Sequence, residues 1–243
     1  MRYRITLSYS GAEFCGWQIQ PNAPSVQETL QKALSTLLGE EISVVGAGRT
    51  DTGVNAHNYV AHFDCSTAVD SEALSYKLNA ILPHSISIHR VERTSDEFHA
   101  RFDARRREYT YYIHRTKDPF ARHYSYQCSY PVMDIDEMNR AAQMLVGTHD
   151  FSSFEKIGAD NKTSICTVFE AYWQKDDEDH WSFHIAADRF LRNMVRAIVG
   201  TLIEVGRGKR SADSIPELLM AQKRSAAGES VPGNALFLSK IEY

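Results

Sequence analysis

The N-terminal segment RYRITLSY alternates polar and apolar side chains. Successive side chains of an extended strand point to opposite faces, so Tyr3, Ile5, Leu7 and Tyr9 would share one face. This period of two predicts a half-buried strand over residues 2–9.

The segment SVQETLQKALSTLLG changes to the spacing of an amphipathic helix. Ser25 and Glu28 have the spacing of a capping box, which satisfies backbone N–H groups at a helix start. Gly39 follows the last apolar residue, and glycine readily adopts the left-handed backbone that ends many helices. We therefore expect a helix with both ends marked.

The same criteria place the other elements along the chain. The expected strands cover residues 41–47, 58–65, 85–92, 107–114, 164–174 and 180–187, and a last strand covers ALFLSKIEY. The expected helices run from Asp70 to about Ala80, from about Ile135 to a stop at Gly147, over residues 189–206 with Asp188 as N-cap, and from Pro216 to Gln222.

The order of these elements predicts an α+β fold. The first half reads β-α-β-β-α-β, the ferredoxin-like arrangement in which two helices cover one face of a mainly antiparallel sheet. The second half repeats the order without visible sequence repetition. We expect two ferredoxin-like halves, residues 1–100 and 101–243, with a cleft between them and strands able to join into one extended sheet.

Composition excludes several classes of protein. Of the 243 residues, 43% are hydrophobic and 24% charged, which is typical of a globular chain and not of a disordered, fibrous or membrane protein. No apolar run reaches the roughly 18 residues of a membrane span and the N-terminus does not resemble a signal peptide, so we expect a cytoplasmic protein. The four cysteines are scattered without a C-x-x-C pair, which favours reduced thiols.

Positive charge is concentrated locally although the net charge is −4. The basic segments are RFDARRRE, DRFLRNMVR and GRGKR. In the expected helix, Arg189, Arg192 and Arg196 would form one stripe opposite the apolar face, either solvated or in contact with phosphates. Arg196 is expected nearer the buried boundary and needs an anion, for which Asp51 is one candidate.

The stretch VVGAGRTDTGVNAH sets an arginine and an aspartate in a glycine-rich turn. It lacks the G-x-G-x-x-G spacing of a dinucleotide site and the G-K-[ST] of a P-loop. Asp51 is either a turn residue that satisfies local backbone groups or a reactive carboxylate. Glycines permit close approach of a ligand and Arg49 favours an ionised neighbour, so the turn also suits a nucleophile or general base.

The strand in ARRREYTYYI carries tyrosines beside arginines. Alternation places Tyr109 and Tyr111 on one face, and Thr110 and Tyr112 on the other. Aromatic rings beside cations suit the binding of unpaired nucleotides, although tyrosines in strands also belong to ordinary cores.

In the segment GTHDFSSF, His149 and Asp150 are either a catalytic pair or part of an anchored loop. Two phenylalanines, Phe151 and Phe154, favour the anchored loop.

Histidine spacing gives little support to a metal site. His180 and His184 would share a face of a strand, but their neighbours indicate an exposed hairpin and no third ligand is evident. No G-x-S-x-G segment supports a serine nucleophile. We expect no metal site.

Taken together, four segments resemble the TruA family of tRNA pseudouridine synthases over nearly the whole chain. They are GRTDTGVNAHNYVAHFD, FHARFDARRREYTYYI, GTHDFSSF and FLRNMVRAIVG. The resemblance implies a dimeric enzyme of two ferredoxin-like halves that isomerises uridine to pseudouridine at positions 38 to 40 of the tRNA anticodon stem-loop. This isomerisation involves no redox change and no external group transfer, so it requires no cofactor.

The resemblance also implies roles for individual residues. Asp51 would be the catalytic aspartate, Arg49 would assist base flipping and Tyr109 would pack on the uracil. Arg196 would pair with Asp51. The further expected contacts to substrate or RNA are Arg101, Arg189, Arg192 and Leu236.

Three positions depart from the family pattern. Asn55 stands where the family usually has histidine, His57 where leucine is common, and Ala235 where glycine is usual. The first two bear on substrate contacts and not on the reaction, and Ala235 bears on the packing beside the site.

Two other functions are compatible with parts of the sequence. A non-catalytic RNA-binding protein would need the same basic segments and aromatic strand, but the Asp51 carboxylate would weaken its affinity for RNA. A nucleotide-dependent metabolic enzyme would rest on the glycine-rich turn alone.

Overall fold

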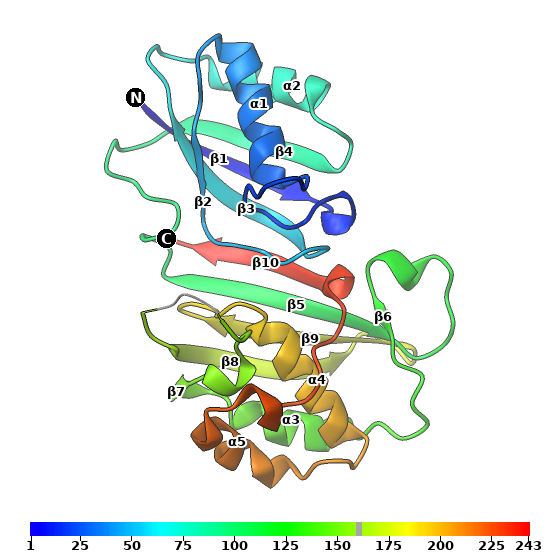
Figure 1. Cartoon of the computed structure of the whole chain (residues 1–243). Helices are drawn as coiled ribbons and strands as arrows, with labels where there is room; N and C mark the ends of the chain where they lie inside the picture. The colour runs from blue at the N-terminus through cyan, green and yellow to red at the C-terminus, as the bar shows by residue number, and fades with distance from the viewer. Residues whose placement is uncertain (159–161) are drawn as a thin grey trace. The chain divides into compact units, whose positions relative to one another are not determined.

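A computed structural model describes residues 1–158 and 162–243 (Figure 1). The chain forms two compact units. The first contains Met1–Arg105 and Phe237–Tyr243, and the second contains Arg106–Leu236. The end of the chain thus packs with its beginning, a long-range arrangement that local patterns do not reveal.

The first unit is a sheet with two helices on one face (Figure 1). Its strands are β1 (Arg2–Tyr9), β2 (Val44–Gly46), β3 (Asn55–Asp64), β4 (Ile86–Arg93) and β10 (Leu236–Glu242), and its helices are α1 (Val26–Leu38) and α2 (Ser71–Ile81). Strand β1 lies antiparallel between β3 and β4. Strand β2 pairs antiparallel with β3 near its end, whereas β10 runs parallel to β3 at its start.

Local signals explain where the helices of this unit begin and end. The Ser25 hydroxyl accepts a hydrogen bond from the Glu28 N–H at 3.3 Å, and Gly39 ends α1 with φ of 70°. The Asp70 carboxylate accepts hydrogen bonds from two backbone N–H groups in the first turn of α2. The predicted β-α-β-β-α-β order of the first half is confirmed.

The second unit is a second, mainly antiparallel sheet with helices. Its strands are β5 (Arg106–His114), β6 (Tyr126–Gln127), β7 (Gly147–Asp150), β8 (Ile165–Lys175) and β9 (His180–Ala187), and its helices are α3 (Ile135–Gln143), α4 (Met194–Gly206) and α5 (Ile215–Ala221). Strand β9 lies between β5 and β8, β7 pairs at the outer side of β8, and β6 runs parallel to β5. Without β6 and β7, the order β5-α3-β8-β9-α4 repeats the first five elements of the first unit, whereas the closing strand β10 groups with the first unit. The α+β class is confirmed.

The helix predicted over residues 189–206 begins later than expected. Helix α4 starts at Met194, after Asn193 with a left-handed φ of 69°. Asp188 is not its N-cap, because the Asp188 carboxylate accepts hydrogen bonds from the N–H groups of Thr167 and Arg189. The predicted stripe of three arginines on one helix is therefore wrong.

Helix α3 also ends earlier than predicted. The helix ends at Gln143, and the next residues form a tighter turn in which the Val146 N–H donates to the Gln143 carbonyl at 3.2 Å. Gly147 has φ of 113° and begins strand β7 instead of ending the helix. Gly147 therefore lies where the next strand begins, four residues after the end of the helix.

The alternation predicted for β1 is confirmed by burial. Tyr3, Ile5, Leu7 and Tyr9 are all less than 5% exposed, and the residues between them are half-buried. Within the described ranges no helix combines the length and apolarity required to cross a bilayer.

Candidate active site

The turn between β2 and β3 carries Asp51 and is docked on the loop after β1. The Gly53 N–H donates to the Phe14 carbonyl at 3.4 Å, and the Val54 N–H closes the turn on the Asp51 carbonyl at 3.1 Å. Thr50 is buried, whereas Asp51 is half-buried and Arg49 is exposed. The turn therefore holds its threonine inward and presents the two residues predicted to be functional.

Two glycines near the contact between the turn and the loop after β1, Gly16 and Gly46, leave no room for a side chain. A Cβ at Gly16 would lie 2.2 Å from the Thr50 carbonyl oxygen, and Gly16 also has φ of +93°. A Cβ at Gly46 would meet the Tyr59 hydroxyl at 2.3 Å. In contrast, a Cβ at Gly48 would meet no atom within 4 Å. The space beside Gly48 is open, as the close approach of a ligand requires.

Two tyrosines to which the sequence assigned no role in the site, Tyr9 and Tyr59, hold the turn through hydrogen bonds of their hydroxyl groups. The Tyr59 hydroxyl accepts a hydrogen bond from the Gly48 N–H at 3.2 Å and donates to the Gly48 carbonyl. The Tyr9 and Thr50 hydroxyls share a hydrogen bond of 2.9 Å. The backbone of Gly48 and the side chain of Thr50, both on the N-terminal side of Asp51, are therefore held by hydrogen bonds.

The tyrosines are themselves locked by aromatic packing. The Trp17 and Tyr59 ring centroids lie 4.2 Å apart, and the Tyr9 and Tyr59 rings meet edge to face at 5.6 Å. Tyr59 is fully buried and Tyr9 is 4% exposed. Such packing restricts side-chain motion, so the turn rests on a rigid base.

Asn55 has a structural role that the sequence left unexplained. Its side-chain oxygen accepts a hydrogen bond from the Gly11 N–H at 2.8 Å, and the residue is 2% exposed. Gly11 itself could not carry a Cβ, which would lie 2.3 Å from the Val54 carbonyl oxygen. Asn55 therefore joins the turn to the loop after β1, and its departure from the family pattern falls on a buried contact.

The Tyr59 hydroxyl provides a direct test of this support. We expect Tyr59→Phe to lower the free energy of unfolding by about 1–2 kcal/mol, because both backbone groups of Gly48 lose their partner. The resemblance described above implies conversion of tRNA, and we also expect roughly tenfold slower single-turnover conversion, because the turn holding Asp51 loosens. The measurements are urea unfolding and rapid-quench kinetics.

A matched control is Tyr3→Phe, which removes a hydroxyl that accepts a hydrogen bond from the Val69 N–H at 2.9 Å, at the other end of the same buried face of β1. That variant should lose similar stability without slowing conversion. Equal rates for Tyr59→Phe and wild type would show that the hydroxyl does not position the turn.

The second unit carries Tyr109 and Arg196. Tyr109 lies on β5, is 9% exposed and meets the Phe190 ring edge to face at 5.0 Å. Arg196 lies in the first turn of α4, is half-buried, and donates through Nε to the Val231 carbonyl at 2.7 Å. It thereby fixes the segment before β10. The pairing of Arg196 with Asp51 joins residues of different units and stays a prediction.

The remaining predicted contacts differ in accessibility. Arg101 and Arg192 are exposed and Arg189 is half-buried, so these three suit contacts to an anionic ligand. Leu236 is 4% exposed, which favours a packing role. Arg189 and Arg192 lie in the segment that precedes α4 and not on the helix.

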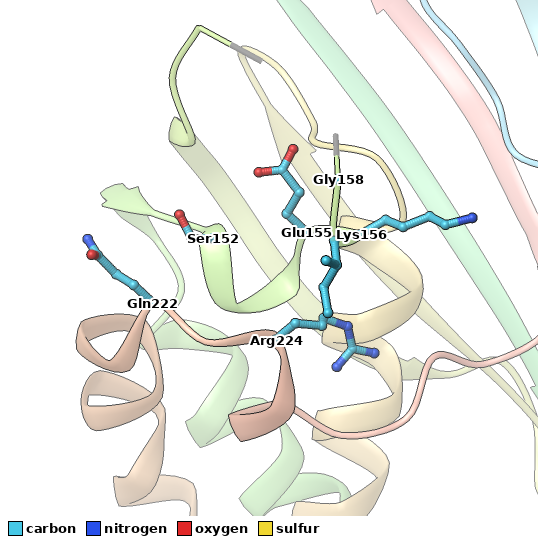
Figure 2. A pocket seen from close by; sticks show the side chains of 7 residues that line it. Ser152, Glu155, Lys156, Gly158, Gln222 and Arg224 are labelled. Atoms are coloured by element: carbon cyan, nitrogen blue, oxygen red, sulfur yellow. The ribbon is translucent and has the colours of Figure 1, made fainter. Parts of the chain in front are cut away.

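The anchored loop predicted around GTHDFSSF is confirmed, since Phe151 and Phe154 are fully buried. Beyond it lies a shallow pocket of about 200 Å³ in the second unit. Its lining residues are Ser152, Glu155, Lys156, Ile157, Gly158, Gln222 and Arg224 (Figure 2). In Figure 2 the cationic ends of Lys156 and Arg224 point away from the Glu155 carboxylate, so the pocket does not gather its charges on one ligand position.

The two histidines considered as metal ligands, His180 and His184, have structural partners. His180 bonds to Asp177 in the exposed turn between β8 and β9, and His184 stacks on Tyr172 at 4.9 Å. Among the described residues, no group of three or more histidine, cysteine or acidic side chains is arranged to hold a metal ion. A carboxylate in a fixed turn, with an arginine beside it, is the group best placed for chemistry.

Comparison with known proteins identifies the class to which this fold and turn belong. A family model described as tRNA pseudouridine synthase matches residues 5–103 and 141–243. The chain belongs to this family and is therefore an isomerase.

Three similar proteins of known name match this chain over nearly its full length. The tRNA pseudouridine synthase A of Bacteroides fragilis is 52% identical over 100% of this chain and 96% of its own length. The enzyme of the same name from Porphyromonas gingivalis is 46% identical over 100% and 97%, and that from Thermoanaerobacter sp. is 44% identical over 98% of each chain.

Proposed function

We propose that this enzyme converts uridine to pseudouridine at positions 38 to 40 of the tRNA anticodon stem-loop, with Asp51 as the catalytic carboxylate. The observation that carries the proposal is the fixed turn around Asp51. Tyr59 holds Gly48 and Tyr9 holds Thr50, while the side of Gly48 that a ligand would approach is open. Membership of the tRNA pseudouridine synthase family supplies the reaction class.

The chemistry is a rearrangement within one nucleotide. The bond between N1 of uracil and C1′ of ribose breaks, the base rotates, and a bond forms between C5 and C1′. The proton on C5 is lost and N1 acquires one, so the product is an isomer of the substrate. Asp51 serves either as a nucleophile at C1′ or as a base whose proton abstraction is followed by capture of a ribose-derived species.

The proposed neighbours of Asp51 bind and orient the uridine. Arg49 is exposed two residues before Asp51 and would assist flipping of the uridine out of the stem. Removing a base from its stack costs a few kcal/mol, which stacking on Tyr109 and contacts to phosphates offset. The Arg196 guanidinium would pair with the Asp51 carboxylate, and Leu236 would pack beside the base.

We further propose that the active protein is a homodimer and acts in the cytoplasm, where its tRNA substrate is found. The support for the dimer is the resemblance to the TruA family. Sedimentation at micromolar concentration should therefore give the mass of two chains.

Binding of tRNA should depend strongly on salt even though the net charge is −4. The proposed phosphate contacts of Arg101, Arg189 and Arg192 would release counterions from the RNA. Each contact should make the plot of log binding constant against log salt concentration steeper by about 0.7 to 0.9. Replacing one of these arginines with glutamine should reduce the slope by about one. The measurement is a filter-binding titration from low to physiological salt. A flat dependence for the wild-type enzyme would contradict the proposed contacts.

The main rival is a non-catalytic RNA-binding protein on the same scaffold. Position mapping separates the two functions. Unmodified tRNA transcripts with uridine at only one of positions 38, 39 and 40 are incubated with the enzyme, and pseudouridine is located by reverse transcription after carbodiimide treatment. We expect modification at these positions and nowhere else. Tight binding without any pseudouridine would favour the rival.

A further inference from the structure

Five aromatic rings follow one another across the first unit, away from the Asp51 turn. In order they are Tyr243, Phe98, His62, His99 and Phe102, and we refer to them as the aromatic row. Successive ring centroids lie 5.1, 6.1, 5.0 and 4.2 Å apart. The row runs from the C-terminal residue to the loop between β4 and β5.

The middle of the row is buried and uncharged. His62 is 3% exposed, and its Nδ1 accepts a hydrogen bond from the Ala100 N–H at 3.1 Å. Burial, together with the charge of Arg2, lowers the pKa of His62 to about 4. At neutral pH the ring is therefore a neutral support for the ring packed on it.

His99 is fixed by its own loop. Its Nδ1 accepts hydrogen bonds from the N–H groups of Arg101 and Phe102, both at 3.2 Å. The Asp103 carboxylate accepts from the His99 N–H at 2.8 Å, and the Asp103 N–H donates to the His99 carbonyl at 3.0 Å. This loop is ordered by its own hydrogen bonds before any ligand arrives.

The outer end of the row is presented to solvent. Phe102 is 74% exposed and stacks on His99 with an angle of 28° between the rings. The Arg101 guanidinium lies 5.7 Å from the Phe102 ring centroid, and Arg105 is also exposed. A single exposed phenylalanine needs no explanation, but a rigid row that ends in an exposed ring beside cations is the arrangement that binds unpaired nucleotides.

We propose that Phe102 is a stacking platform for one unpaired RNA base other than the target uridine, with Arg101 contacting the adjacent phosphate. The proposal rests on the proposed function only for the identity of the RNA as tRNA. His62 and Asn55 are seven residues apart on β3, about 23 Å at roughly 3.3 Å per residue. The platform is thus separate from the turn that would receive the flipped uridine.

Binding measurements on Phe102 variants test the platform. Phe102→Leu keeps an apolar side chain and removes the ring, whereas Phe102→Tyr keeps the ring. With unmodified full-length tRNA as the probe, we expect the leucine variant to bind about 5- to 150-fold more weakly, the range given by loss of one stacked base. The tyrosine variant should bind within about twofold of wild type. Phe120→Leu, at a phenylalanine that is 88% exposed in the second unit, is the matched control and should have no effect.

Salt dependence separates stacking from charge. Phe102→Leu should weaken binding at every salt concentration without changing the log-log slope, whereas Arg101→Gln should lower the slope by about one. Phe102→Trp adds an optical signal, because a base stacked on the indole should quench its fluorescence on addition of tRNA.

Several outcomes would overturn the platform. They are wild-type affinity of Phe102→Leu, equal losses for the leucine and tyrosine variants, or a change in oligomeric state of Phe102→Leu in sedimentation, which would make this surface a protein interface. The result is independent of the proposed reaction. If Phe102→Leu binds tRNA more weakly while the wild-type protein forms no pseudouridine, the platform is retained and the proposed function is rejected. If the wild-type protein forms pseudouridine and Phe102→Leu binds tRNA as tightly as wild type, only the platform is rejected.

Discussion

Replacing Asp51 with asparagine should abolish pseudouridine formation and leave tRNA binding intact. Asparagine has the same shape but is neither a nucleophile nor a base, and loss of such a group typically reduces turnover by roughly a thousandfold or more. The backbone of the turn should survive, because the Val54 N–H donates to the Asp51 carbonyl and not to its side chain. The measurement is single-turnover conversion with enzyme in excess over tRNA.

The control is Glu97→Gln, which removes one negative charge at an exposed position of the same unit. Both variants should melt at the wild-type temperature, and both should bind tRNA at least as tightly as wild type. Only Asp51→Asn should lose conversion. Unchanged conversion by that variant would remove Asp51 from the mechanism.

The second large effect is expected at Gly16, which sets the position of the turn from the loop after β1. In Gly16→Ala the new Cβ would lie 2.2 Å from the Thr50 carbonyl oxygen, at a backbone φ of +93°. Strain and displacement together should cost about 2–3 kcal/mol of unfolding free energy. A shift of about 1 Å in the turn should slow conversion by roughly a hundredfold. Urea unfolding and single-turnover kinetics measure the two effects.

Gly39→Ala separates backbone strain from displacement. Gly39 has a left-handed φ of +70°, but a Cβ there would meet no atom within 4 Å. That variant should lose about 1 kcal/mol and convert tRNA at the wild-type rate. If Gly16→Ala behaves in the same way, the contact between the loop and the turn does not position Asp51.

Elements whose signals are local were predictable from the sequence. Strand β1 and helix α1 follow from side-chain alternation and from the caps at Ser25 and Gly39, which act on neighbouring residues. The start of α4 was not predictable in this way, because the apolar spacing continues before Asn193 while the backbone there is left-handed. Tertiary hydrogen bonds of Asp188 to Thr167 replace the expected cap.

The candidate site shows the same division. Asp51 and Arg49 could be proposed from the sequence alone because they lie in one contiguous motif. Tyr9 and Tyr59 were missed because their contacts depend on the register between β1 and β3, in which Tyr9 lies opposite Ala56. Alternation correctly placed Tyr9 on the buried face, yet nothing local indicates that its hydroxyl meets Thr50.

Release of tritium from C5 of uracil tests the central claim most directly, because forming the bond between C5 and C1′ must displace that hydrogen. Unmodified tRNA labelled at C5 of its uridines is incubated with wild-type enzyme and with Asp51→Asn. We expect release equal to the number of uridines at positions 38 to 40 for the wild-type enzyme and none for the variant. Release from a tRNA that carries cytidine at all three positions, or equal release by Asp51→Asn, would contradict it.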